Sequence, residues 1–404
     1  MNDRSLLESI DQLPWCVLVA SQGRSGVDFL HSLFDSHPQI ITFNGFLLFH
    51  DFWEKSRTVN HQGDIVSEDL VDEFVGHFIH KLRTRYDFVE RKDKLGDGQD
   101  QSFDIDISVF RSHLIRLVSE REITSRNVLQ SVYVAYALTL GDDFSEKRIF
   151  LHQLHQIPKI PLFLKDFPGS RIVTMTRDPR AAYVSSYEHH ALYNSLKANP
   201  ARVYKTLARV VKGENVMEPE YGDAYRAVKL EDLHDKDIGE GVRRSICAWA
   251  GVDFHPCMFE STWGGLKWWG DRMSSSAVYD SGEEAFEKSI TKNKWQEKLS
   301  WVDKYLFEFL LSSRLAHYGY PFRKRSGPFN FVLAFLFIPI PNVYEWRFIG
   351  PTALFSLFRN NGLGSSIQEL VLRIYYYLRR VLLYFGLFWK RLKREPYRIR
   401  ILGG

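Results

Sequence analysis

A short loop near the start of the chain carries residue types that bind anions: Ser21-Gln22-Gly23-Arg24-Ser25-Gly26. It follows an apolar run at residues 15–20, whose length suits a buried central strand. From residue 28 onward, apolar residues recur at helical spacing. A strand, a glycine-bearing loop and a helix start point backbone N–H groups and the positive helix end at one place. With the charge of Arg24 added, the loop predicts a phosphate-binding site.

This loop differs from the Walker A motif of nucleotide kinases. That motif ends in Gly-Lys-Ser/Thr, where the hydroxyl group binds Mg²⁺, whereas here Gly26 is followed by Val27 and Asp28. A glycine-containing turn between a strand and a helix is common in α/β proteins, so the loop alone leaves a structural and a functional interpretation open.

A second stretch, residues 167–187, favours the functional interpretation. An apolar strand at 172–176 leads to Arg177, then to Asp178-Pro179 as helix N-cap and first helical residue, and Ser185 stands eight residues after Arg177. Together the two stretches resemble the sulfotransferase family, whose donor is 3′-phosphoadenosine 5′-phosphosulfate. The resemblance covers roughly residues 14–50 and 145–322.

The resemblance implies that Gly23 to Asp28 line the 5′ side of the donor site. Arg24 would meet the charge that grows on the bridging oxygen as the S–O bond lengthens, and so stabilise the transition state. Backbone N–H groups of Ser25, Gly26 and Val27 would bind the 5′-phosphate. Val27 and Asp28 depart from the family's commoner hydroxyl-bearing residues. Asp28 adds a negative charge near a phosphate, which the site tolerates if the carboxylate points away along the helix, where the helix dipole favours it.

The resemblance places the 3′-phosphate on two further residues. Arg177 would bind it by charge-assisted hydrogen bonds and Ser185 by its hydroxyl group. Their separation puts both on one face of the helix start. Arg180 is expected to be a solvated helix residue.

Three residues remain open as the catalytic base: His152, His155 and Glu146. Sulfotransferases use histidine or glutamate to take the proton of the acceptor hydroxyl, and imidazole suits proton transfer near neutral pH. A histidine on a mixed face is also typical of a structural role. Trp268, with Trp269, is expected either to stack on adenine or to be core. No ligand spacing among the 14 histidines and 3 cysteines predicts a metal site.

Composition bounds the class of protein. The 404 residues suffice for one large core or two modest ones, and 45% hydrophobic with 25% charged residues is typical of globular proteins. Three cysteines cannot all pair, which indicates a reducing compartment. The first residues contain no apolar run long enough for a signal peptide. We therefore expect a cytoplasmic enzyme, and nothing predicts a nucleic-acid partner.

The expected fold is α/β, with a P-loop-like central, mostly parallel sheet flanked by helices in a domain at residues 1–326. Helical patterns between about residues 50 and 140, where the resemblance is weakest, predict a helical insert that sets acceptor specificity. Residues 228–233 resemble a strand-to-helix step of the same family.

Residues 327–404 have a different character. The apolar run at 329–340 is broken by Pro339 and is too short to span a bilayer. Residues 365–394 are amphipathic, and residues 365–404 carry nine lysines and arginines against two glutamates, a local charge of +7 in a chain of net charge +4. This pattern favours a helix lying on an anionic membrane, peripheral on the inner face. The alternative is a helix packed on the domain, with solvated arginines.

The resemblance implies transfer of a sulfuryl group from 3′-phosphoadenosine 5′-phosphosulfate to a hydroxyl of a carbohydrate or glycolipid acceptor. Two rivals stay open: a P-loop kinase-like enzyme, and a catalytically silent nucleotide-binding or membrane-scaffold protein. The missing Lys-Ser/Thr argues against the first, while Val27-Asp28 motivates the second. The oligomeric state is not predicted.

Overall fold

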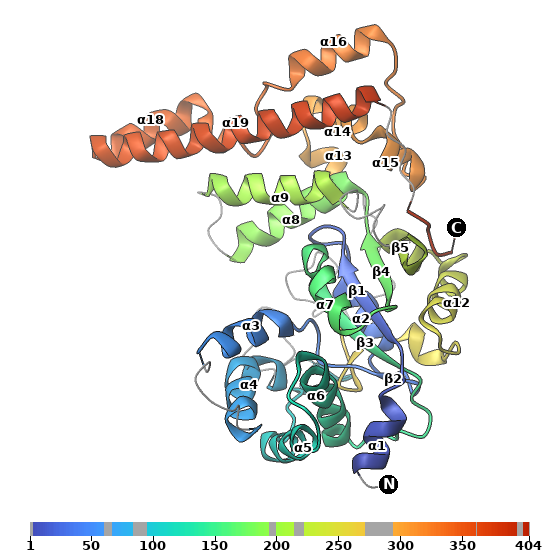
Figure 1. Ribbon diagram of the computed structural model, residues 1–404. Helices are drawn as coiled ribbons and strands as arrows, with labels where there is room; N and C mark the ends of the chain where they lie inside the picture. Colours follow the sequence, from blue (N-terminus) through green and yellow to red (C-terminus); the bar gives the residue numbers. More distant parts are fainter. Residues whose placement is uncertain are drawn as a thin grey trace.

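A five-stranded parallel sheet lies at the centre of the computed structural model (Figure 1). The structure describes residues 3–59, 67–83, 95–193, 199–213, 222–270, 294–360, 362–393 and 399–403. The strand order is β2-β3-β1-β4-β5, and every neighbouring pair is parallel. The strands are β1 (Trp15–Ala20), β2 (Ile40–Ile41), β3 (Ile149–Gln156), β4 (Arg171–Thr176) and β5 (Tyr225–Lys229). The predicted α/β class with a central parallel sheet is confirmed.

Strand β1 lies in the middle of the sheet, as its continuous apolar run predicts. Its first five residues are buried, because helices cover both faces of the sheet. On one face, Trp15 packs against Tyr133 and Phe163, with ring centroids 5.2 and 5.5 Å apart. The strands that follow β1 lie on both sides of it, an arrangement that opens a crevice at the carboxyl edge of the sheet.

Helices cover the sheet or pack on the helices that cover it. They are α1 (Asp3–Ile10), α2 (Val27–Phe34), α7 (Ile160–Asp166), α8 (Pro179–Tyr193), α9 (Pro200–Lys212), α11 (Leu230–Leu233), α12 (Gly239–Ala250), α13 (Trp295–Lys298), α14 (Trp301–Leu310) and α15 (Ser312–His317). A separate antiparallel hairpin consists of β6 (Thr262–Trp263) and β7 (Leu266–Lys267). Figure 1 shows α8 and α9 on one side of the sheet and α12 at its edge.

The predicted helical insert is present. It consists of α3 (Phe49–Val59), α4 (Ser67–Leu82), α5 (Ile107–Ser119) and α6 (Ser125–Leu140). Side chains cap two of these helices, since Asp106 accepts the Ser108 and Val109 N–H groups and Thr124 accepts the Asn127 N–H group. The insert lies on the far side of the sheet from the C-terminal helices (Figure 1).

The C-terminal extension is helical, as predicted. It contains α16 (Pro328–Phe337), α17 (Trp346–Ile349), α18 (Pro351–Asn360) and α19 (Leu363–Lys393), which cross above α8 and α9 in Figure 1. After α19 the chain returns to the sheet, where the Arg400 carbonyl accepts the Ala227 N–H group at 2.9 Å and the Leu402 N–H group donates to the Ala227 carbonyl at 2.8 Å. Among the described helices, none has the length and apolarity needed to traverse a lipid bilayer.

Candidate functional site

The loop between β1 and α2 lies at the carboxyl edge of the sheet, where the sequence predicts an anion site. The Ser21 N–H donates to the Met175 carbonyl of β4 (3.1 Å), so the loop starts from two adjacent strands. Gly26 begins α2 with a φ of 90°, and a Cβ there would lie 2.5 Å from Leu230 Cδ1. The turn therefore requires glycine at position 26. Arg24 also has a left-handed backbone, with a φ of 61°.

Buried side chains hold this loop against the second motif. Gln22 Nε2 donates to the Arg177 carbonyl (2.7 Å), and Gln22 Oε1 accepts from Arg314 Nη2 (2.8 Å). Arg177 Nη1 donates to the Arg24 carbonyl at 3.3 Å. Ser186 Oγ donates to the Gly23 carbonyl at 3.1 Å. Two stretches about 150 residues apart in the sequence thus form one site.

Arg24 and Arg177 are predicted to bind the two phosphate-bearing ends of the donor. Their side chains lie close enough to interact electrostatically. Burial lowers the pKa of Arg177, the Glu231 carboxylate opposes that shift, and the charge of Arg24 adds to it. Two like charges near each other are stabilised when an anion binds between or beside them. The site is therefore electrostatically suited to a polyanion.

Glu231 supports the position of Arg177 from α11. Its Oε1 accepts the Asp178 N–H group and its Oε2 accepts the Tyr320 hydroxyl, each at 3.0 Å. Burial raises the pKa of Glu231, while the Asp178 N–H group and Arg177 oppose the increase. The family-like pattern of residues 228–233 does not by itself predict this role for Glu231.

Two serines of the predicted donor site occupy different environments. Ser25 is 1% exposed, and its Oγ has no hydrogen-bond partner among the residues that the structure describes. Buried hydroxyl groups are nearly always satisfied, so an acceptor bound in the loop would supply the missing bond. Ser185 lies half-buried on α8, next to Ser186, which contacts the loop directly.

The Asp28 carboxylate is held by the sheet. Gln153 Nε2 of β3 donates to Asp28 Oδ1 at 2.6 Å, and Gln153 Oε1 lies 2.5 Å from His31 Nδ1. This negative charge sits in the first turn of α2, where the helix dipole favours it. The Asp28 carboxylate therefore points toward β3, where Gln153 is its hydrogen-bond partner.

Of the three candidate bases, His155 lies at the carboxyl edge of the sheet. It pairs with Val19, near the end of β1, after a β-bulge that shifts the register of β3. Its φ is 63°, a left-handed conformation that costs a non-glycine residue free energy. The half-buried ring lies 4.9 Å from the Phe46 ring, and Nδ1 is buried with no hydrogen-bond partner in the described chain.

The positions of His152 and Glu146 argue against both as the base. His152 is fully buried in the core, where Nδ1 lies 2.7 Å from the Tyr133 hydroxyl and the ring stacks on Phe163 at 4.8 Å. Burial lowers the pKa of His152 well below its usual value. Glu146 is exposed and precedes β3, so it lies at the amino edge. The eight residues of β3 separate it from the loop by about 25 Å.

The expectation that Arg180 is solvated is wrong. Its side chain is fully buried and pairs with Asp178 at 2.7 Å. It also donates to the Pro321 carbonyl (2.7 Å), and its guanidinium lies 4.0 Å from the centre of the Trp295 ring. The predicted N-cap is present, since Asp178 Oδ1 accepts the Arg180 N–H group at 2.9 Å. Arg180 therefore joins the start of α8 to α13 and to the chain after α15.

Trp268 and Trp269 belong to packed protein contacts. Trp268 packs edge-on against Trp263 with ring centroids 5.7 Å apart, and Trp269 Nε1 donates to the Gly96 carbonyl at 2.6 Å. Both rings are largely buried, which agrees with the core alternative for these residues. In the described part of the chain, no group of three histidine, cysteine, aspartate or glutamate side chains is arranged to hold a metal ion.

Comparison with known proteins finds similarity among solved structures. No protein-family model and no curated protein match the chain. Among solved structures, it is similar to the sulfotransferase domain from the Synechococcus PCC 7002 olefin synthase, with 16% identity over 69% of this chain and 87% of that one, and a TM-score of 0.35. A similarity of this extent does not assign the chain to a family.

Proposed function

We propose that the protein transfers a sulfuryl group from 3′-phosphoadenosine 5′-phosphosulfate to a hydroxyl group of a carbohydrate or glycolipid acceptor. The observation that carries this proposal is the contact between the two motifs, in which Arg177 donates to the Arg24 carbonyl and Gln22 joins both. Two guanidinium groups at the ends of adjacent strands suit a ligand with two separate phosphate groups.

The residues present fit this donor. Arg24 and the backbone N–H groups of Ser25, Gly26 and Val27 would hold the 5′-phosphosulfate, and the buried Ser25 hydroxyl would gain an acceptor. Arg177, with Ser185 on α8, would hold the 3′-phosphate. A Cβ at Gly23 would lie 3.1 Å from Ser186 Oγ, so a small residue lets the loop approach α8.

Arg24 and His155 would carry the chemistry. The donor, when bound, supplies the sulfuryl group. Arg24 places a fixed cation where negative charge develops on the leaving oxygen, which stabilises the transition state more than the ground state. His155 would accept the proton of the acceptor hydroxyl, because it lies at the same edge of the sheet as the loop. The bulge in β3 would set the direction of its imidazole.

A second candidate function is donor binding without catalysis. It is favoured by Val27, which offers no hydroxyl donor, and by the carboxylate of Asp28 in the first turn of α2. The Gln153 contact with Asp28 limits this objection, since it partly satisfies the negative charge. A P-loop kinase-like activity has less support, because the loop lacks the lysine and the hydroxyl that such enzymes use with Mg²⁺.

Thermal-shift measurements with 3′,5′-bisphosphoadenosine and with ADP test the donor assignment. We expect the bisphosphate to raise the melting temperature more than ADP, and Arg177→Ala to remove that difference. Arg171→Ala is the matched control, because Arg171 is exposed at the opposite end of β4. Equal shifts by both nucleotides in the wild-type protein would show that the site does not recognise a 3′-phosphate.

Turnover measurements separate the two candidate functions. With a labelled donor and a panel of sugar and glycolipid acceptors, Arg24→Ala should lower kcat more than donor affinity, because the charge it meets develops in the transition state. A protein that binds the bisphosphate tightly but transfers to no acceptor would support the silent alternative.

A further inference from the structure

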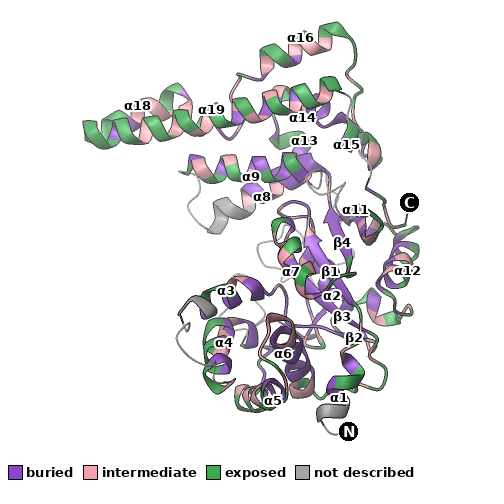
Figure 2. Ribbon diagram, viewed as in Figure 1, coloured by how far each residue is buried: buried purple, intermediate pink, exposed green. Residues whose placement is uncertain are grey.

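The C-terminal helices expose an unusual amount of apolar surface. Of the 22 large hydrophobic side chains that are exposed among the described residues, 17 lie between residues 329 and 392. Figure 2 shows α16, α18 and α19 with long stretches of exposed residues, whereas the interior of the sheet region is buried. Contiguous apolar patches of this kind are rare on soluble monomers and mark interaction surfaces.

Helix α19 has two apolar faces, and the protein covers one of them. The buried face carries Arg380, Tyr384 and Phe388, and the helix contacts α9, α14 and α17. Successive residues of an α-helix are rotated by 100° about its axis, so the second apolar stripe lies about a quarter turn or more around the helix from the buried face. The outward stripe consists of Leu363, Ile367, Val371, Ile374, Tyr375, Leu378, Leu382, Trp389 and Leu392, all exposed. The helix is about 46 Å long, so this stripe is extensive.

Two neighbouring helices extend the outward stripe. Phe335 of α16 packs against Phe385 of α19 with ring centroids 5.3 Å apart, which joins the two helices side by side. On the outward face of α16, Phe329 is 72% exposed and Leu336 is 59% exposed. Helix α18, which contacts α19, adds Phe355 at 70% exposure. We call the exposed apolar side chains of α16, α18 and α19 the outer face.

The charges of the extension divide between its interior and its surface. Arg380 forms a buried ion pair with Glu345 at 3.0 Å, and Arg373 pairs with Glu369 at 2.9 Å. The alternative of a helix packed on the domain included solvated arginines, whereas Arg373 and Arg380 form ion pairs and are largely shielded from solvent. Glu345 and Glu369, the two carboxylates in the described part of the extension, therefore both form ion pairs within the extension. Other cations of the extension are exposed.

The exposed cations border the outer face. Arg379, Lys390 and Lys393 are exposed, and their helical positions place them beside the outward stripe of α19. Arg359 is exposed at the end of α18. With the described carboxylates already paired, the surface around the outer face is positive.

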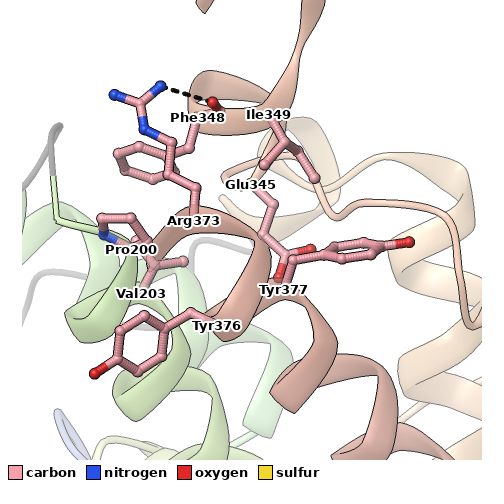
Figure 3. A pocket seen from close by; sticks show the side chains of 8 residues that line it. All are labelled: Pro200, Val203, Glu345, Phe348, Ile349, Arg373, Tyr376 and Tyr377. Carbon is pink, nitrogen blue, oxygen red and sulfur yellow. Dashed lines mark hydrogen bonds between the residues drawn. The ribbon is translucent and has the colours of Figure 1, made fainter. Parts of the chain in front are cut away.

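Contacts with the domain fix the orientation of α19. Figure 3 shows a small recess where α9, α17 and α19 meet, lined by Pro200, Val203, Glu345, Phe348, Ile349, Arg373, Tyr376 and Tyr377. The Arg373 Nη1 group donates to the Phe348 carbonyl at 2.8 Å, as the dashed line marks. The helix is thus held to the protein on its buried side, which leaves the outer face accessible to a partner.

We propose that the outer face binds the surface of an anionic lipid bilayer, lying in the headgroup region without crossing it. Apolar side chains, bordering cations and exposed aromatic residues such as Trp389 and Tyr375 are the combination found in interfacial helices. A second copy of this chain fits less well, because it would bring the same cations without an unpaired described carboxylate to meet them. The proposal does not depend on sulfuryl transfer.

Vesicle flotation with the full chain tests the proposal. Vesicles of phosphatidylcholine alone are compared with vesicles that also contain phosphatidylglycerol. A truncation after residue 326 is unsuitable, because residues 400–402 hydrogen-bond to Ala227 of β5. We expect the wild-type protein to float with the anionic vesicles and to dissociate as salt concentration rises.

Two sets of substitutions separate the apolar and ionic contributions. Leu378→Ser/Leu382→Ser/Trp389→Ser should weaken partition about tenfold or more. A matched control is Val109→Ser/Ile238→Ser/Phe259→Ser, three similarly exposed residues outside the extension, which should bind like wild type.

Arg379→Gln/Lys390→Gln/Lys393→Gln should weaken binding to anionic vesicles about fivefold for each charge removed. Lys236→Gln, an exposed lysine outside the extension, is its control and should leave binding unchanged. Circular dichroism and melting temperature confirm that each variant is folded.

A wild-type protein that floats with neither vesicle type would overturn the proposal. So would unchanged flotation of the triple serine variant. If light scattering finds a dimer that the serine variant dissociates, and no flotation occurs, the outer face is a self-association surface instead.

Discussion

Replacing His155 by glycine and, separately, by alanine tests whether β3 stores backbone strain at the proposed base. A left-handed conformation costs a non-glycine residue roughly 1–2 kcal/mol, and His155 has a φ of 63°. Glycine in a strand normally costs about 0.5–1 kcal/mol relative to alanine, because it loses more backbone entropy. The difference predicts that His155→Gly is more stable than His155→Ala by roughly 0.5–1 kcal/mol, the reverse of the usual order.

Both variants lose the imidazole and its contact with Phe46, so their comparison isolates the backbone. Urea denaturation gives each free energy of unfolding. The neighbouring residue supplies a matched control, since Gln156 has an ordinary extended backbone with a φ of −127°. There the alanine variant should be the more stable one. If His155→Ala is more stable than His155→Gly, the backbone at position 155 is not strained.

The same variants report on catalysis. If His155 is the base, both lower kcat by about 10²–10⁴-fold while the affinity for 3′,5′-bisphosphoadenosine stays near that of the wild type. Near wild-type turnover in both would exclude His155 as the base whatever the stability result.

Three further predictions concern the residues around the loop. Gly26→Ala should destabilise the protein by roughly 2–4 kcal/mol in urea denaturation, because of its left-handed backbone and the contact that a Cβ would make with Leu230; a loss below about 0.5 kcal/mol would contradict the turn geometry. Burial lowers the pKa of His234 from 6.5 to about 4, so between these values the unfolded chain binds a proton that the folded chain does not. Stability should therefore fall as pH drops through this window, by up to roughly 3 kcal/mol, and His234→Gln should flatten that dependence. Arg314→Met removes the buried donor to Gln22 and should cost roughly 2–4 kcal/mol and weaken bisphosphate binding by calorimetry, whereas unchanged affinity would show that Gln22 holds the loop without it.

Local signals in the sequence predict the parts of the site that follow single strands. The apolar run of β1, the glycine-bearing loop and the start of α2 are contiguous, so their order reveals the turn. The same holds for β4, Asp178 and α8. These elements are predictable because each depends on neighbouring residues, and the structure confirms them.

Contacts between segments that are distant in the sequence could not be predicted from local patterns of residues. Arg180 is buried because Trp295 and Pro321 meet it from more than 100 residues away. The preference for His155 over Glu146 depends on the direction of β3, which was not predicted as a strand. Similarly, the composition of α19 reveals apolar stripes but does not indicate which stripe packs on the protein.

The strand order has a consequence for how the chain folds. Strand β1 lies between β3 and β4, and its residues pair with partners more than 130 positions later: Trp15 with Phe150, and Cys16 with Arg171. The central strand therefore has no strand partner in the sheet until residues 149–156 of β3 have been synthesised. Long-range pairing of this kind slows folding, and an exposed apolar strand is prone to aggregate in the meantime. The contacts among the helices of the insert are mostly local, so we expect these helices to form before the sheet does.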